Sequence, residues 1–296
     1  MLKIRVPATS ANIGPGFDSL GLALKLYNLV YMEENEGPDI ATLDGTVVPL
    51  DEENLIYKSA KFFYDLCGRP FPGLKIRQEN NIPMTRGLGS SSACIVAGIV
   101  GANALLGEPL KKDDLVNLAA VLEGHPDNST PAILGGLTTA VLQENRVYSV
   151  KVPVSGRIKF AAFIPDFELK TEVSRAALPT EVSHKDAVFN VSRAALMTAA
   201  LFSGSLDNLR IAVEDKLHQP YRMQFIPGAE DIFELAMRYG AYGAYISGAG
   251  PTLMGIVNVT DLGYCERAKA DLLKNDKGWD LVMLDCDETG AVVEEA

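Results

Sequence analysis

The chain has 296 residues, of which 47% are hydrophobic, so it can bury a sizeable core. Its length allows one large domain or two of ordinary size, and we expect two. A formal net charge of −11 and a pI near 4.8 argue against a nucleic-acid binder, which would need a broad basic face. We therefore expect a protein that acts on small molecules, with no nucleic-acid partner.

The first half predicts an alternation of strands and helices. Its two opening strands are joined by the loop ATSANIGPGFDS, which is rich in Gly, Asn and Pro. The expected elements, in chain order, are strands over 2–8 and 21–33, a helix after DEEN, a strand over 74–78, an apolar helix ending near Gly107, an amphipathic helix over KKDDLVNLAAVLEG, and a hairpin over 132–142 and 146–152.

The pattern changes after about residue 153. A strand over 158–164 is followed by helices over 186–202, 206–217 and 229–239, and then by strand, strand, helix and strand to residue 285. We therefore predict an N-terminal domain over 1–153 and a C-terminal domain over 154–296. No internal repeat or low-complexity linker separates them, so we expect the halves to pack closely with a cleft between them.

Targeting and metal-binding signals are scarce. The first residues, MLKIRVPATSANIG, lack an apolar segment with a small-residue cleavage site, and the apolar run over 93–106 is shorter than the about 20 residues that span a bilayer. The four cysteines show no CxxC or Cys/His pairing, and three histidines form no cluster. We expect a cytoplasmic protein with no membrane anchor.

The loop GLGSSSA, residues 87–93, opens the apolar helix and predicts an anion site. A helix N-terminus offers unpaired N–H groups and partial positive charge. Gly87 and Gly89 can bring the backbone close to a phosphate, the serine hydroxyls can donate or bind Mg²⁺, and Arg86 adds positive charge. In isolation, a stretch rich in Gly and Ser is more often a flexible connector than a ligand site, and its position before a helix is what favours the site. No GxxxxGK[ST] occurs, and no GxGxxG follows a strand, so a third type of nucleotide loop is indicated.

Three segments together resemble the motifs of the GHMP kinases, in the order found in that superfamily. VPATSANIGPGFDSLGLAL (6–24) resembles the first motif, PMTRGLGSSSA (83–93) the second, and SGAGPTLMGIV (247–257) the third. Within the superfamily, NIGPGFDSLGLAL combined with EGHPDNSTPAILGG (123–136) resembles the homoserine kinase family. The resemblance implies an α+β fold with an N-terminal domain like ribosomal protein S5 domain 2 and a ferredoxin-like C-terminal domain.

The resemblance also implies a reaction and its ligands. An enzyme of this family transfers the γ-phosphoryl group of ATP, with Mg²⁺, to the side-chain hydroxyl of L-homoserine in threonine biosynthesis, and a homodimer is expected from family resemblance alone. ATP would lie in the cleft. Its expected contacts are Pro83, Met84, Thr85, Arg86, Gly87, Leu88, Gly89, Ser90, Ser91, Ser92, Ala93, Gly248, Gly250 and, near the base, Asn54. A helix N-cap explains Asn54 equally well.

Homoserine is a zwitterion, so its pocket needs cations for the carboxylate and acceptors for the ammonium group. Family positions place Arg175 and Arg222 against the carboxylate, with Thr171 nearby, and a guanidinium suits this through its bidentate fork. The other expected pocket residues are Asn12, Asp18, His125, Asp127 and Asn128, with Asp18 or Asp127 facing the ammonium group. Surface ion pairs for the arginines, turn chemistry for Asn12 and Asp18, and a helix end for His125 are the alternatives.

The predicted catalytic group is Glu123, Asn128 and Arg175. Ser91 and Glu123 match the family's magnesium ligands, although a solvated carboxylate at a helix end is the alternative for Glu123. Asn128 stands where several superfamily members have an aspartate, and an amide cannot accept a proton. We expect Asn128 to orient the alcohol, which loses its proton directly to the γ-phosphoryl group or to water.

Two rival functions stay open at this level. One is a GHMP kinase for mevalonate or a related alcohol. Mevalonate has no ammonium group, so it would not need two aspartates together with two arginines. The other is a non-catalytic GHMP protein that binds a small ligand as a regulator, which residue identities alone do not exclude.

Overall fold

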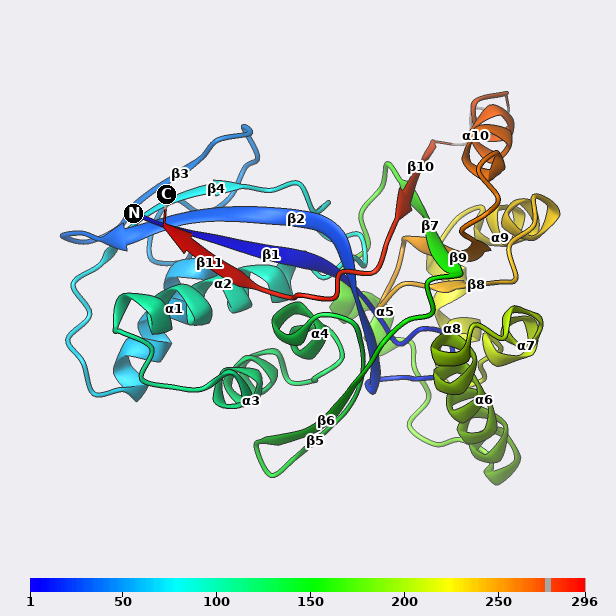
Figure 1. Cartoon of the computed structure of the whole chain (residues 1–296), viewed down its shortest axis with the longest axis horizontal. Helices are drawn as coiled ribbons and strands as arrows, with labels where there is room; N and C mark the ends of the chain where they lie inside the picture. The colour runs from blue at the N-terminus through cyan, green and yellow to red at the C-terminus, as the bar shows by residue number, and fades with distance from the viewer. Residues whose placement is uncertain (275–277, 296) are drawn as a thin grey trace.

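A computed structural model describes residues 1–274 and 278–295 of the chain, and it contains two sheets side by side (Figure 1). The first sheet has the order β11-β1-β2-β4-β3, extended from β2 by the hairpin β5–β6, and the second has the order β10-β7-β9-β8. The strands of the first sheet are β1 (Leu2–Ala11), β2 (Leu20–Glu34), β3 (Asp39–Thr42), β4 (Leu74–Glu79), β5 (Leu137–Gln143), β6 (Arg146–Val152) and β11 (Val292–Glu295). Those of the second are β7 (Ile158–Pro165), β8 (Gly243–Ile246), β9 (Leu253–Asn258) and β10 (Trp279–Leu284).

Helices cover one face of the first sheet, and most of the others lie on the side of the second sheet away from the first (Figure 1). The helices on the first sheet are α1 (Leu55–Leu66), α2 (Ser90–Leu105), α3 (Lys112–Glu123) and α4 (Ser129–Leu134). Those with the second sheet are α5 (Thr171–Ala176), α6 (His184–Ser203), α7 (Leu206–Ala212), α8 (Gln219–Arg222), α9 (Ala229–Arg238) and α10 (Tyr264–Lys274), with a 3₁₀ turn over Met223–Phe225. The mixed helix and sheet arrangement confirms the predicted α+β class.

Most predicted elements are confirmed, and the differences have local causes. The hairpin does not begin at residue 132, because residues 129–134 form α4. The helix predicted over 206–217 ends at Ala212, because Asp215 accepts hydrogen bonds from the backbone N–H groups of residues 217–219 and starts a new turn. The sequence patterns gave no sign of β3, β11, α5 or α8, each of which spans only four to six residues.

The core joins the two sheets. Helix α2 lies against α1, α3 and β1 and is apolar all round, as expected for a buried helix. The largest hydrophobic cluster runs from Ile4 in β1 to Met254 in β9, so the two halves share packed interior. Among the described residues, no helix is long and apolar enough to cross a membrane.

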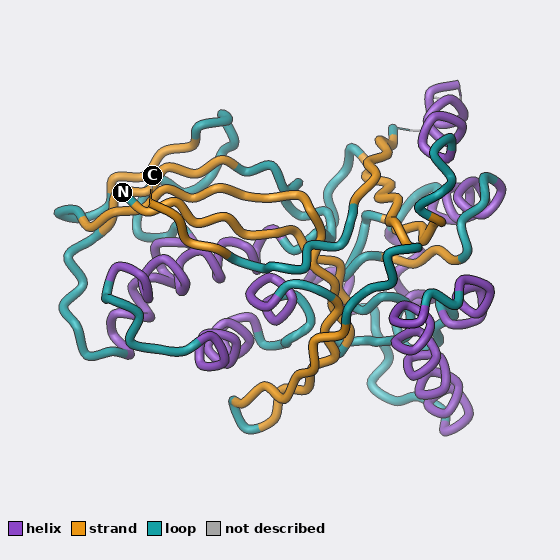
Figure 2. Tube along the Cα trace, in the orientation of Figure 1, coloured by secondary structure: helices purple, strands orange, loops and turns teal. Residues whose placement is uncertain are grey.

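Two features bring the halves together. The loop between β1 and β2 lies on the side of the first sheet that faces the second sheet (Figure 2), and there Asn12 contacts Gly248 and Pro15 contacts Asn190. The chain also returns, because β11 pairs antiparallel with β1. The predicted domains 1–153 and 154–296 do not account for β11, which comes late in the chain but pairs with the first sheet. This division stays a prediction.

Candidate active site

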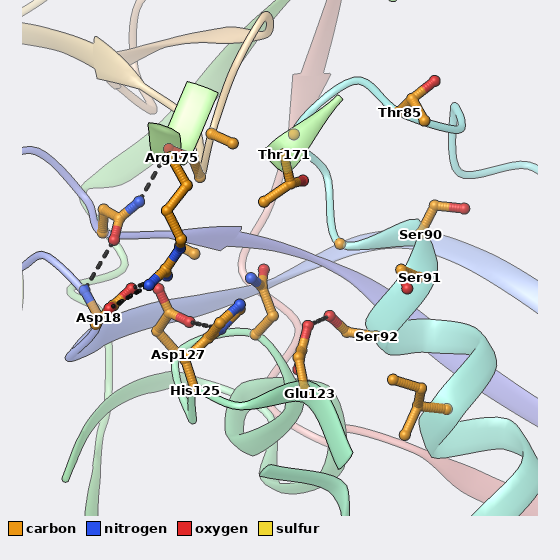
Figure 3. A pocket seen from close by; sticks show the side chains of 18 of the residues that line it. Asp18, Thr85, Ser90, Ser91, Ser92, Glu123, His125, Asp127, Thr171 and Arg175 are labelled. Carbon is orange, nitrogen blue, oxygen red and sulfur yellow. Dashed lines mark hydrogen bonds and ion pairs between the residues drawn. The ribbon is translucent and has the colours of Figure 1, made fainter. Parts of the chain in front are cut away.

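A cavity of about 480 Å³ lies where both halves contribute side chains (Figure 3). Loops of the first sheet line it on one side, and α5, α8 and the glycine loop at Gly248 line it on the other. The predicted residues that line it are Asn12, Asp18, Thr85, Arg86, Gly87, Gly89, Ser90, Ser91, Ser92, Glu123, His125, Asp127, Asn128, Thr171, Arg175, Arg222 and Gly248. Segments more than 200 residues apart in sequence, such as those of Asn12 and Gly248, thus meet in one cleft.

Some predicted nucleotide contacts do not line this cavity: Asn54, Pro83, Met84, Leu88, Ala93 and Gly250. Leu88 and Ala93 are buried in the core. The Asn54 side chain accepts hydrogen bonds from the N–H groups of Ile56 and Tyr57, at 3.0 and 3.4 Å, so it caps α1. The N-cap interpretation therefore holds for Asn54, and its neighbour Leu55 faces the cavity instead.

The serine loop is fixed by close contacts rather than flexible. Gly89 is the N-cap of α2 with φ +70°, and a Cβ there would lie 1.9 Å from Oγ1 of Thr9. Gly87 has φ +75°, and its Cβ would lie 2.4 Å from the carbonyl oxygen of Ser247. Only glycine fits both positions. The loop therefore presents the first turn of α2, with Ser90 and Ser91, to the cavity.

Arg86 ties this loop to the second sheet. Its Nε donates to the carbonyl oxygen of Pro165 at 3.1 Å, and its Nη2 donates to that of Asp166 at 2.8 Å. Its Nη1 lies 3.5 Å from a carboxylate oxygen of Glu168. The guanidinium is thus largely engaged by the end of β7, although Arg86 also lines the cavity. Its expected contact with phosphate stays a prediction.

The first-motif loop faces α5 through an ion pair. Arg175 donates from Nη2 to Oδ1 of Asp18 at 2.6 Å and from Nη1 to Oδ2 at 3.1 Å. Oδ1 of Asn12 accepts from the backbone N–H of Asp18, and Nδ2 of Asn12 donates to the carbonyl oxygen of Gly248 at 2.9 Å. The turn interpretation therefore describes Asn12, whose amide shapes the loop while bordering the cavity.

The HPDN segment adds a second charged pair. Nδ1 of His125 lies 2.7 Å from Oδ1 of Asp127. Burial lowers the pKa of His125, but the hydrogen bond and charge of Asp127 outweigh it and raise the pKa to about 9. Oδ1 of Asn128 accepts from the Thr9 hydroxyl at 2.8 Å, which fixes the orientation of its amide.

Glu123, at the end of α3, is not a solvated carboxylate. Its Oε1 accepts from the Ser92 hydroxyl, and its Oε2 is buried with no hydrogen-bond partner among the described residues. Burial raises the pKa of Glu123 to about 7, against the opposing charge of His125. No group of three or more His, Cys, Asp and Glu that could hold a metal occurs in the described part of the chain. An unpaired carboxylate oxygen and the Ser91 hydroxyl on one cavity fit Mg²⁺, which takes few protein ligands beside phosphate oxygens.

The sequence reasoning missed several residues near the cavity. Leu55, Ile95 and Leu122 give it an apolar wall. The ring of Phe17 has the guanidinium carbons of Arg175 and Arg222 at 5.5 and 5.3 Å from its centroid. Its position directly before Asp18 in the first motif was an available signal. Nothing in the sequence pattern pointed to the apolar wall.

Comparisons with known proteins agree with this geometry. The model of the GHMP kinase N-terminal domain matches residues 54–136, and that of the GHMP kinase C-terminal domain matches residues 197–272. The fold and the glycine-rich serine loop thus define a GHMP-type kinase.

The most similar relatives that we compared belong to one family within the GHMP kinases. A homoserine kinase of Caldicellulosiruptor saccharolyticus is 47% identical, covering 99% of this chain and 96% of the relative, and one of Clostridium beijerinckii is 45% identical, covering 100% and 99%. The crystal structure of a homoserine kinase from Cytophaga hutchinsonii is 28% identical with a TM-score of 0.86, covering 99% of this chain and 97% of that one. The chain therefore belongs to the homoserine kinase family of the GHMP kinases.

Proposed function

We propose that this enzyme transfers the γ-phosphoryl group of ATP to the side-chain hydroxyl of L-homoserine, giving O-phospho-L-homoserine in threonine biosynthesis. The observation that carries the proposal is the charge pattern of one cavity. Arg175 and Arg222 line it together with Asp18 and Asp127, beside the N-terminus of α2. Such a cavity can hold an amino-acid zwitterion and a polyphosphate at the same time.

The two ligands occupy different parts of the cavity in this proposal. The first turn of α2 and Ser90 to Ser92 bind the phosphates, while Arg175, Arg222 and Thr171 bind the carboxylate of homoserine. Asp18 or Asp127 accepts from its ammonium group. Asp18 and Arg175 pair with each other, so a bound zwitterion replaces this one ion pair with two, one from each residue to the substrate.

Asn128 orients the reacting hydroxyl. Its amide is held by the Thr9 hydroxyl at 2.8 Å, so the free Nδ2 group can be presented at a fixed angle. An amide takes no proton, and the alcohol proton passes to the γ-phosphoryl group or to water. Positioning and charge stabilisation supply the rate in a loose phosphoryl transition state.

Mg²⁺ is the proposed metal, with Ser91 and Glu123 as its protein ligands. When bound, it neutralises charge on the β- and γ-phosphate oxygens. The Oε2 atom of Glu123, which has no hydrogen-bond partner among the described residues, supports this assignment, although the Ser92 hydroxyl, rather than that of Ser91, contacts the carboxylate. Ser92 therefore belongs to the same proposed group.

The test is ADP release by the purified protein with Mg-ATP. L-homoserine, D-homoserine, L-serine, mevalonate and galactose are compared at equal concentration. Stimulation by L-homoserine alone supports the proposal. Stimulation by mevalonate or galactose keeps a kinase but rejects the zwitterion pocket, and ATP binding without stimulation by any substrate favours the non-catalytic rival.

A homodimer in the cytoplasm completes the proposal. Family resemblance is what supports the dimer, and light scattering during gel filtration measures it directly. A mass near the 31.9 kDa of one chain would reject it.

A further inference from the structure

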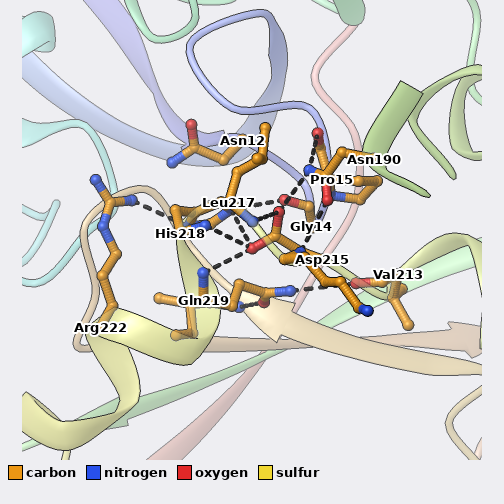
Figure 4. A network of polar contacts seen from close by, with 12 residues as sticks. Asn12, Gly14, Pro15, Asn190, Val213, Asp215, Leu217, His218, Gln219 and Arg222 are labelled. Atoms are coloured by element: carbon orange, nitrogen blue, oxygen red, sulfur yellow. Dashed lines mark hydrogen bonds and ion pairs between the residues drawn. The ribbon is translucent and has the colours of Figure 1, made fainter. Parts of the chain in front are cut away.

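The segment between α7 and α8 forms a buried polar network against the first-motif loop (Figure 4). Asp215 is its centre. Its carboxylate accepts hydrogen bonds from the backbone N–H groups of Leu217, His218 and Gln219 at 3.0, 2.9 and 2.7 Å, and from Nδ2 of Asn190 at 2.6 Å. Four donors satisfy the Asp215 carboxylate, and Nε2 of His218 lies 3.7 Å from its Oδ2, beyond hydrogen-bond length.

The contacts of the His218 ring fix its protonation. The ring is fully buried, with Nε2 2.6 Å from the carbonyl oxygen of Gly14 and Nδ1 3.2 Å from Nη1 of Arg222. A carbonyl oxygen only accepts, so Nε2 carries a hydrogen, and a guanidinium only donates, so Nδ1 offers its lone pair. The imidazole is therefore neutral. Burial lowers the pKa of His218, and the charge of Arg222 acts in the same direction against Asp215 and Asp18.

Only one nitrogen of the Arg222 guanidinium, Nη1, makes hydrogen bonds to the described residues. Its Nη1 donates to the carbonyl oxygen of Gly248 at 2.6 Å and meets Nδ1 of His218. Its Nε is buried, and neither Nε nor Nη2 has a hydrogen-bond partner in the described ranges. The Phe17 ring stacks on His218 at 5.4 Å and lies under the guanidinium. The free edge of Nε and Nη2 has the fork geometry that binds a carboxylate.

We propose that His218 is a positioning residue for the amino-acid substrate: as a neutral acceptor it orients Arg222 so that the Nε and Nη2 edge binds the substrate carboxylate. This rests on the proposed function, because it needs a ligand with a carboxylate. His218 itself does not contact the substrate. It also joins the carboxylate site to the first-motif loop, since its other nitrogen holds Gly14.

Two substitutions of His218 separate the roles of its two ring nitrogens, because each keeps the hydrogen bond of one nitrogen and removes that of the other. In His218→Asn, the amide oxygen takes the place of Nδ1 and keeps an acceptor for Arg222. In His218→Gln, the amide nitrogen takes the place of Nε2, keeping the bond to Gly14 and losing the acceptor. Losing a hydrogen bond to a charged group weakens binding about 10- to 100-fold. We therefore expect KM for L-homoserine to rise about 10- to 100-fold in His218→Gln. In His218→Asn it should rise far less, with KM for ATP unchanged in both.

A substrate without the carboxylate provides the matched control. For 3-aminopropan-1-ol, the two variants should have the same kcat/KM as the wild type. Equal KM values for L-homoserine in the two variants, or an equal loss with 3-aminopropan-1-ol, would overturn the proposal and leave His218 a purely structural residue.

Two measurements separate this proposal from the proposed function and from misfolding. If the wild type phosphorylates no homoserine, the proposed function fails, and calorimetric dissociation constants of L-homoserine for the two variants still test His218. If both variants fail to fold, ¹⁵N-histidine NMR of the wild type decides, because only three histidines give signals. A neutral ring protonated at Nε2 supports the proposal, and an imidazolium or a ring protonated at Nδ1 rejects it.

Discussion

Replacing Gly89 by alanine tests whether the serine loop needs its close approach to β1. The left-handed backbone at φ +70° costs a residue with a side chain about 1 to 2 kcal/mol. The new Cβ would also lie 1.9 Å from Oγ1 of Thr9, and overpacking of this kind costs about a further 1 to 3 kcal/mol. Thr9 holds Asn128, so the disturbance also reaches the substrate side of the cavity.

The other end of the same helix supplies a matched control. Gly107 follows α2 with φ +78°, and nothing lies within 4 Å of a Cβ built there. Gly107→Ala should therefore lose only the backbone contribution of about 1 to 2 kcal/mol in urea unfolding. Gly89→Ala should lose about 1 to 3 kcal/mol more, and its kcat/KM for ATP should fall about 100-fold through misplacement of the phosphates.

A second substitution sharpens this prediction. Thr9→Ala removes the atom that the new Cβ would strike, so adding it to Gly89→Ala should recover part of the lost stability relative to Thr9→Ala alone. Equal unfolding free energies and equal ATP kinetics for Gly89→Ala and Gly107→Ala would refute the steric reasoning, and the loop would then be free to move aside.

Three further predictions concern charged and polar residues of the cavity. The pKa of Glu123 is raised from 4.5 to about 7 in the folded protein, so the free energy of unfolding falls as the pH rises through this range. The pKa of His125 is raised from 6.5 to about 9, so the stabilisation by its positive charge is lost as the pH rises through that range. Glu123→Gln should therefore flatten the metal-free unfolding free energy between pH 4.5 and 7, and an unchanged slope counts against the buried carboxylate. Asn128→Ala should lower kcat by about 100-fold through misorientation. A bell-shaped rate profile that disappears in Asp127→Asn would instead reveal a base. Arg175→Lys should raise KM for L-homoserine by about 10- to 100-fold while KM for ATP holds, since lysine lacks the bidentate fork. A rise in both KM values would point to a collapsed cleft.

Much of the fold and of the cavity could be predicted from the amino-acid sequence, because the relevant signals are local. The spacing of hydrophobic residues along the chain predicted most of the strands and helices. A glycine-rich loop before an apolar helix indicates an anion site, since helix ends leave N–H groups unpaired. The three motifs, read as a resemblance, also assigned the family and most residues that line the cavity.

The contacts that these residues make depend on the packing of the folded chain. Whether Glu123 is solvated depends on what covers the end of α3, and the fold buries Oε2 there. Asn54 proved to cap α1, which spacing alone left open. His218 lies 204 residues from Gly14 in sequence, and Phe17 and Arg222 are separated by a similar stretch of chain. Contacts of that separation are set by the packing of the two halves, and no local pattern in the chain encodes them.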